Sequence, residues 1–175
     1  MNEIKEVSRK NKRGLVILAV LSILNISYEL LGQIQALIIG QLSKGQLEEL
    51  INSAKKLTES TGVEDVYGIF ERMYAVQRIQ NDQFYFSHGF ALITLVLGLT
   101  GVILMLQKKS SGFQLYIIYA LLSCFGLFLY VPFDIIPIPV VIMNVFVSGI
   151  FVLLYHLNRS WDNKEQQPGD SEEIS

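Results

Sequence analysis

Four long stretches of this chain are apolar and almost free of charge, and they limit its possible folds more than any other feature. They cover residues 14–39, 84–106, 113–131 and 137–157, and Glu29 is the only Asp, Glu, Lys or Arg within them. A helix needs about 20 apolar residues to cross the roughly 30 Å hydrocarbon layer of a bilayer. Backbone amides in lipid must also be hydrogen-bonded within the segment. The pattern therefore predicts an all-α integral membrane protein built on a four-transmembrane-helix bundle.

The composition excludes several other classes of protein. Hydrophobic residues make up 51% of the chain and charged residues only 17%, whereas an ordinary soluble domain has about 25% charged residues. This excludes a soluble domain, a disordered chain and a nucleic-acid binder that works through a basic surface. The short alternating strands of a transmembrane barrel are absent from the pattern.

The distribution of Lys and Arg predicts the orientation, because these residues concentrate in the cytoplasmic loops of membrane proteins. Residues 1–13 contain five, the turn 107–112 contains two and the tail 158–175 contains two. The turn 132–136 contains none, and segment 40–83 contains five that are diluted by seven acidic residues. We expect a cytoplasmic (inner) membrane protein with both termini in the cytoplasm, and with segment 40–83 and the turn 132–136 outside. The tail is too polar to fold, so we expect it to be disordered.

The 40–83 segment is predicted to form an extracytoplasmic helical hairpin between the first and second spans. Capping boxes, in which a Ser or Thr precedes a Gln or Glu by three residues, start at Ser43 and at Thr61. Apolar residues follow each box at helical spacing. We expect helices over 43–60 and 63–81, whose apolar faces pack on each other, lie on the lipid surface or bind a partner.

Polar side chains recur at similar depth in three of the predicted spans. Asn25, Glu29 and Gln33 lie at intervals of four and so share one face of the first span. A carboxylate that faces lipid costs several kcal/mol, so we expect Glu29 inside the bundle. It should form a hydrogen bond with a polar side chain of another helix, with His88 and Asn144 as first candidates. Three interpretations stay open: bonds that join helices, a ligand site, or a first helix that leaves the hydrocarbon before Glu29.

Small residues predict how the second span packs. They lie three or four residues apart on one face, which would let a neighbouring helix approach closely: Ser87, Ala91, Thr94, Gly98 and Gly101. Aromatic residues near the span ends, including Phe84 and Tyr155, are typical of the belts that membrane proteins place at the lipid–water interface.

The residues that usually carry chemistry are few. The chain has one cysteine, Cys124, and two histidines, His88 and His156, which the predicted topology places on opposite sides of the membrane. No phosphate-binding loop, dinucleotide fingerprint or zinc motif occurs, so we expect no catalytic residues, no cofactor and no metal site. We therefore expect a non-catalytic accessory or interaction subunit of a larger membrane assembly. Its partners would be the lipid bilayer and another protein or a second copy, with no nucleic acid.

The alternative function is a small transporter or channel that uses the polar cluster around Glu29. It requires an aqueous path through the other half of the bundle as well. An intramembrane enzyme ranks third, because no nucleophile–base pair is evident in the sequence.

Overall fold

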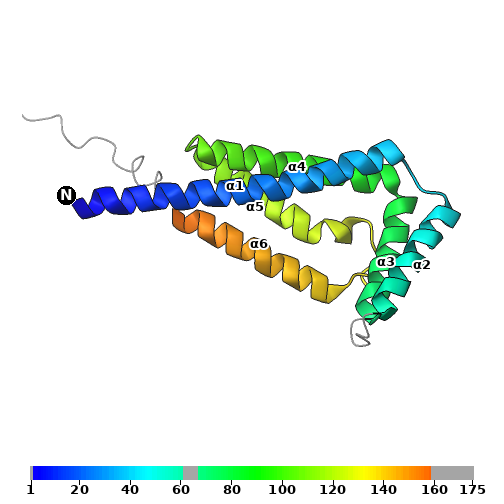
Figure 1. Ribbon diagram of the computed structural model, residues 1–175. Helices are drawn as coiled ribbons and strands as arrows, with labels where there is room; N and C mark the ends of the chain where they lie inside the picture. The colour runs from blue at the N-terminus through cyan, green and yellow to red at the C-terminus, as the bar shows by residue number, and fades with distance from the viewer. Residues whose placement is uncertain (1, 61–66, 159–175) are drawn as a thin grey trace, which may run out of the picture.

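The chain folds into helices joined by short connections (Figure 1). The computed structural model describes residues 2–60 and 67–158, and it describes side chains over 13–56 and 68–158. Within that part of the chain there is no strand. The elements are α1 (Asn2–Ile39), α2 (Lys44–Ser60), α3 (Tyr67–Asp82), α4 (Phe84–Leu106), α5 (Ser110–Phe125), the 3-10 helix η2 (Gly126–Leu129) and α6 (Ile138–Asn158).

Four of these segments are long and apolar enough to span a membrane, which confirms the helical class predicted from the sequence. They are Arg13–Ile39, Phe84–Leu106, Ser110–Leu129 and Ile138–Asn158. The start predicted for the second helix of the 40–83 segment, the capping box at Thr61 and nearly all of the 158–175 tail lie outside the described residues.

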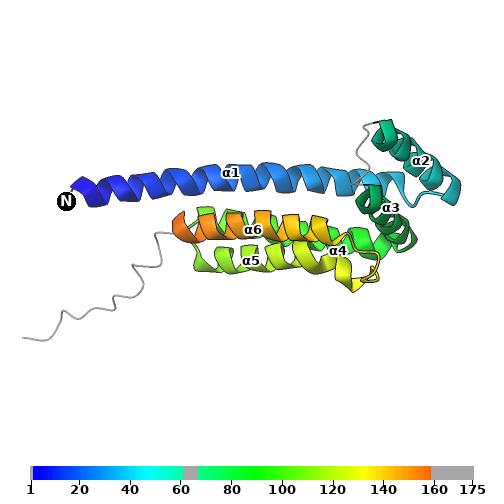
Figure 2. The ribbon, with the colours of Figure 1, turned by 90° about the horizontal axis from the view of Figure 1, so that it is seen from below.

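The four long helices run side by side, and α2 and α3 lie across one end of them (Figures 1 and 2). We call this the α2–α3 end and the opposite one the Lys108 end. Helix α1 extends past the other helices at the Lys108 end (Figure 2), because nothing breaks the helix between Asn2 and Arg13. It terminates at Gly40, whose φ of 79° is a left-handed conformation that glycine adopts without a steric penalty.

Helices α4 and α5 touch through their backbones near the Lys108 end. A Cβ atom added at Gly101 would lie 2.9 Å from the backbone nitrogen of Tyr116 and 3.0 Å from the carbonyl oxygen of Gly112. A Cβ atom at Gly98 would meet the ring of Tyr119 at 2.6 Å. The small residues at this end of the α4 stripe therefore permit a helix approach that any side chain would prevent.

In the half of the bundle near the Lys108 end, a buried cluster of hydrogen bonds joins three helices. The Tyr155 hydroxyl of α6 donates to Ser22 Oγ of α1 at 3.0 Å, and the Tyr116 hydroxyl of α5 lies 3.4 Å from the same oxygen. Tyr155 is fully buried, so its expected place in an interfacial belt is wrong. Its ring packs edge-on against Tyr116 with centroids 4.7 Å apart. A hydroxyl that finds partners in the core no longer needs water.

Helices α2 and α3 form a small layer with its own core. The capping box at Ser43 is formed, since Gln46 Oε1 accepts from the Ser43 backbone N–H at 3.1 Å and the Gln46 N–H reaches Ser43 Oγ at 3.4 Å. Leu47, Ile51 and Tyr74 bury their side chains between the two helices. The apolar faces of α2 and α3 thus pack on each other, as in the first of the three expected arrangements.

Helix α3 also packs on the bundle. Val76 joins a buried cluster with Val131, Ile136 and Val141, which belong to the turn between η2 and α6 and to the start of α6. Gln80 Nε2 donates to the Tyr130 hydroxyl at 3.2 Å. These contacts fix the α2–α3 layer over the end of the bundle at which the polar residues lie.

Candidate functional site

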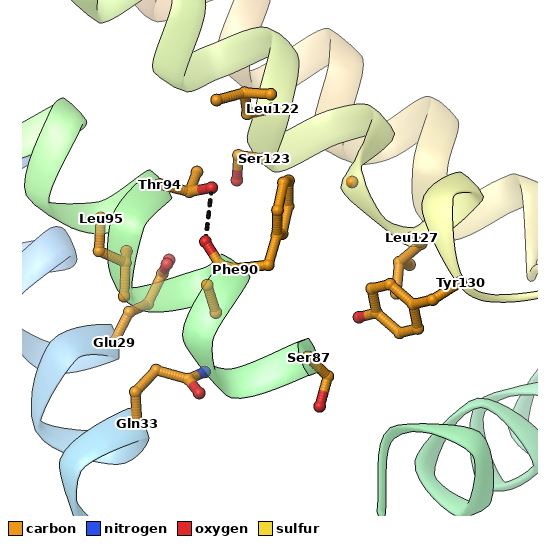
Figure 3. A pocket seen from close by; sticks show the side chains of 12 residues that line it. Glu29, Gln33, Ser87, Phe90, Thr94, Leu95, Leu122, Ser123, Leu127 and Tyr130 are labelled. Atoms are coloured by element: carbon orange, nitrogen blue, oxygen red, sulfur yellow. Dashed lines mark hydrogen bonds between the residues drawn. The ribbon is translucent and has the colours of Figure 1, made fainter. Parts of the chain in front are cut away.

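A cavity of about 140 Å³ lies between α1, α4 and the end of α5, close to the α2–α3 end (Figure 3). It forms where α5 gives way to the tighter 3-10 turn η2, opposite the small side chains of α4. It is lined by polar and apolar groups in similar numbers: Glu29, Gln33, Ser87, Phe90, Ala91, Thr94, Leu95, Leu122, Ser123, Gly126, Leu127 and Tyr130.

Among the described residues, Glu29 is the only charged side chain that lines the cavity. The residue is exposed, and Asn25 Nδ2 of the same helix donates to its Oε1 at 2.9 Å. Figure 3 shows the carboxylate directed toward Thr94 and Leu95 of α4. The side chain thus borders a space between helices but stays exposed, so the expectation that it lies inside the bundle is wrong. Its hydrogen-bond partner comes from one turn earlier in α1, and not from another helix.

His88 bonds to Gln33 in place of the expected Glu29. Its Nδ1 lies 2.6 Å from Gln33 Oε1, and its ring packs on the buried Phe84 ring with centroids 4.5 Å apart. An amide oxygen can only accept a hydrogen bond, so Nδ1 of His88 is the protonated ring nitrogen in this pair. The reason for the change of partner is axial position, since Gln33 lies one helical turn closer to the α2–α3 end than Glu29.

Asn144 lies apart from the other four members of the predicted polar cluster. It is exposed on α6 and does not line the cavity. Only Val141 and Tyr155 of α6 are buried, because this helix contacts the bundle along a narrow face. The structure therefore brings Asn25, Glu29, Gln33 and His88 together along α1 and α4, and leaves Asn144 outside the group.

The sequence stripe of small residues divides between two environments. Gly98 and Gly101 pack against α5, whereas Ser87, Ala91 and Thr94 line the cavity. Ser123 and Tyr130, which also line it, were not among the predicted cluster. The sequence predicts only that the third span reaches the same end of the bundle. It does not predict the 3-10 turn beside which the cavity forms.

Metal binding and thiol chemistry both depend on the side chains that lie around the cavity. Among the described residues there is no group of three His, Cys, Asp or Glu side chains that could hold a metal ion. The single thiol, Cys124, is buried and its Sγ lies 3.5 Å from Ser148 Oγ of α6. The arrangement offers a carboxylate, hydroxyls and an amide for binding. Comparison of the chain with protein-family models, with curated proteins and with solved structures finds no significant match.

Proposed function

We propose that this chain is a non-catalytic, multi-pass protein of the inner membrane that acts as an accessory subunit of a larger assembly, and that α6 binds a transmembrane helix of the partner. Both termini and the turn at Lys108 lie in the cytoplasm, and α2 and α3 lie outside. The single observation that carries the proposal is Asn144. It is an exposed carboxamide at the seventh residue of α6, an apolar helix that is buried at only two positions.

The energetic argument starts from the cost of leaving Asn144 in lipid. Its side chain makes no hydrogen bond within the described part of the chain, and an amide without a partner in an apolar medium costs several kcal/mol. Exposed leucines and valines do not indicate a partner helix, because lipid tails solvate them as well as another helix would. An amide that bonds to a polar group of a second helix recovers about 1 kcal/mol or more. A partner helix on this face removes the penalty.

The transporter alternative has less support. A transport path must continue beyond the Glu29 cavity toward the Lys108 end. There the bundle is filled by buried apolar side chains, among them Leu18, Val102 and Met105, together with the hydrogen-bonded Tyr155. The polar cavity occupies one half of the bundle, and this arrangement favours binding over passage.

Site-specific photo-crosslinking in native membranes tests the partner. A photoreactive residue at Val147, one turn from Asn144 and itself exposed, should form an adduct of defined mass. The same residue at Ile93, an exposed position on α4, serves as the matched control and should label lipid alone. Asn144→Leu should weaken the adduct at Val147. An adduct with a second copy of the chain would identify self-assembly, while recovery of monomer alone from Val147 would refute the proposal.

Cysteine labelling tests the topology independently. Replacement of the buried Cys124 by serine gives a cysteine-free protein. Single cysteines can then be introduced into it one at a time. A membrane-impermeant maleimide should label Lys56→Cys on α2 in intact cells and should leave Lys109→Cys unlabelled until the membrane is opened. The reverse pattern would overturn the orientation.

A further inference from the structure

We propose that the cavity beside Glu29 is a binding site for a small organic cation with a primary ammonium group. This goes beyond the partner-binding role of α6, because the cavity lies between α1, α4 and α5 and includes no residue of α6. The proposal rests on three properties of the lining: its charge, the direction of its hydrogen bonds and its shape.

The first property is an uncompensated negative charge. Among the described residues that line the cavity, Glu29 is the one carboxyl or amine, and it accepts a hydrogen bond from the neutral amide of Asn25. That amide donates to one carboxylate oxygen and carries no charge of its own. The cavity therefore presents a carboxylate with no Lys, Arg or His beside it among the described residues of the lining.

The second property is that the hydroxyls of α4 present acceptors. Ser87 Oγ donates to the carbonyl oxygens of Gln80 and Phe84 at 3.0 and 3.1 Å, and Thr94 Oγ1 donates to the carbonyl oxygen of Phe90 at 2.9 Å (Figure 3). Each hydroxyl has a single proton, so what remains for a ligand is its lone pairs. An ammonium group has three donors and no acceptor, so it can bond to these lone pairs and to the Glu29 carboxylate.

The third property is the size and the apolar part of the lining. A volume of about 140 Å³ is close to the roughly 150 Å³ of a protein cavity that binds benzene, which is more than a bare metal ion needs. Phe90 and Tyr130 contribute aromatic rings, which attract cations through their faces. Ala91, Leu95 and Leu127 offer apolar surface to a short carbon chain. The lining therefore suits an alkylammonium group better than an inorganic ion.

Two sources could supply such a group: a free amine or the ethanolamine headgroup of a membrane lipid. Both share the primary ammonium that the acceptors recognise, and the lipid composition around the protein distinguishes them. The test uses the full chain in nanodiscs of phosphatidylcholine, whose headgroup has no N–H donor. Thermal unfolding is followed by far-UV circular dichroism, because a ligand that binds only the folded state raises the midpoint.

We expect n-butylammonium to raise the unfolding midpoint of the wild-type protein in a saturable manner, and butan-1-ol, its uncharged analogue, to leave it unchanged. Glu29→Gln keeps the shape and the acceptor for Asn25, and should weaken binding at least about tenfold. Asp134→Asn removes an acidic residue that is exposed in the turn before α6 and should bind like the wild type. Ala91→Leu, which fills the cavity but keeps the charge, should also abolish the shift.

The second arm replaces phosphatidylcholine by phosphatidylethanolamine. If the lipid headgroup occupies the site, the wild type should gain stability over Glu29→Gln in these nanodiscs and butylammonium should add nothing. If a free amine is the ligand, butylammonium should act equally in both lipids. An equal shift for wild type and Glu29→Gln, or an equal shift with butan-1-ol, would overturn the proposal.

Discussion

The close approach of α4 and α5 makes one substitution especially informative: Gly101→Ala. The added Cβ atom would lie 2.9 Å from the backbone nitrogen of Tyr116, whereas ordinary contact begins at 3.4 Å. A backbone atom cannot rotate away, so the two helices must separate by about 0.5 Å. Overpacking of this kind costs typically 1–3 kcal/mol. Because alanine is the better helix former by about 1 kcal/mol, the net loss of unfolding free energy should be about 0–2 kcal/mol.

Gly89→Ala is the matched control, since Gly89 lies on the same helix and an added Cβ atom there would meet nothing within 4 Å. Both substitutions gain the same helix propensity, so their difference isolates the contact with α5. We expect Gly89→Ala to be neutral or stabilising, and Gly101→Ala to be less stable than it by about 1–3 kcal/mol.

Reversible unfolding in mixed micelles of dodecylmaltoside and sodium dodecyl sulfate, followed by circular dichroism, gives both free energies under one condition. Equal stabilities for the two variants would refute the reasoning, because they would mean that α5 does not approach α4 at Gly101. An intermediate series with Gly101→Ser would show whether the cost follows the size of the added group.

Three further changes test other parts of the structure. Tyr155→Phe removes the buried hydroxyl that donates to Ser22 and should lower the unfolding free energy by about 1 kcal/mol in the same micelle assay; no change would mean that the two groups do not bond. Arg78→Ala breaks a bidentate pair with Glu48, and the side chains of this pair are about half exposed. The change should therefore lower the unfolding free energy by less than about 1 kcal/mol. A larger loss that persists in high salt would contradict the assignment as a screened surface pair. Lys108 has a φ of 61°, and Lys108→Gly should raise stability by up to about 1 kcal/mol; a loss of stability would show that its side chain makes a contact worth more than the backbone strain.

The sequence predicts those parts of the fold that depend on one segment at a time. The length and apolarity of each span give the four long helices, and the Ser43 capping box gives the start of α2 to within one residue. The repeat of Asn25, Glu29 and Gln33 at intervals of four places them on one face, and Glu29 and Gln33 do line the same cavity. Local periodicity determines such features, so reasoning from spacing recovers them.

The features that depend on pairing between distant segments could not be predicted. Tyr155 and Ser22 are 133 residues apart, and a tyrosine near the end of an apolar stretch has the same sequence signature whether it lies in a belt or in the core. The partner of His88 depends on the axial offset between α1 and α4. An axial offset of one helical turn, about 5.4 Å, is enough to make Gln33 the hydrogen-bond partner of His88 in place of Glu29.

The α4 stripe shows most directly why a pattern on one helix does not determine a site. Small residues repeat along the whole face from Ser87 to Gly101, yet one half makes the tightest helix contact and the other half borders a cavity. The difference lies in what stands opposite: α5 is a regular helix beside Gly101, but beside Thr94 and Ser87 it is approaching the 3-10 turn that ends it. Small residues remove side-chain volume, and the facing backbone decides whether that volume is filled by a helix or left for a ligand. A site of this kind is therefore a property of two segments. The space beside Glu29 exists because the regular part of α5 stops at Phe125, whereas α4 extends on to Phe84.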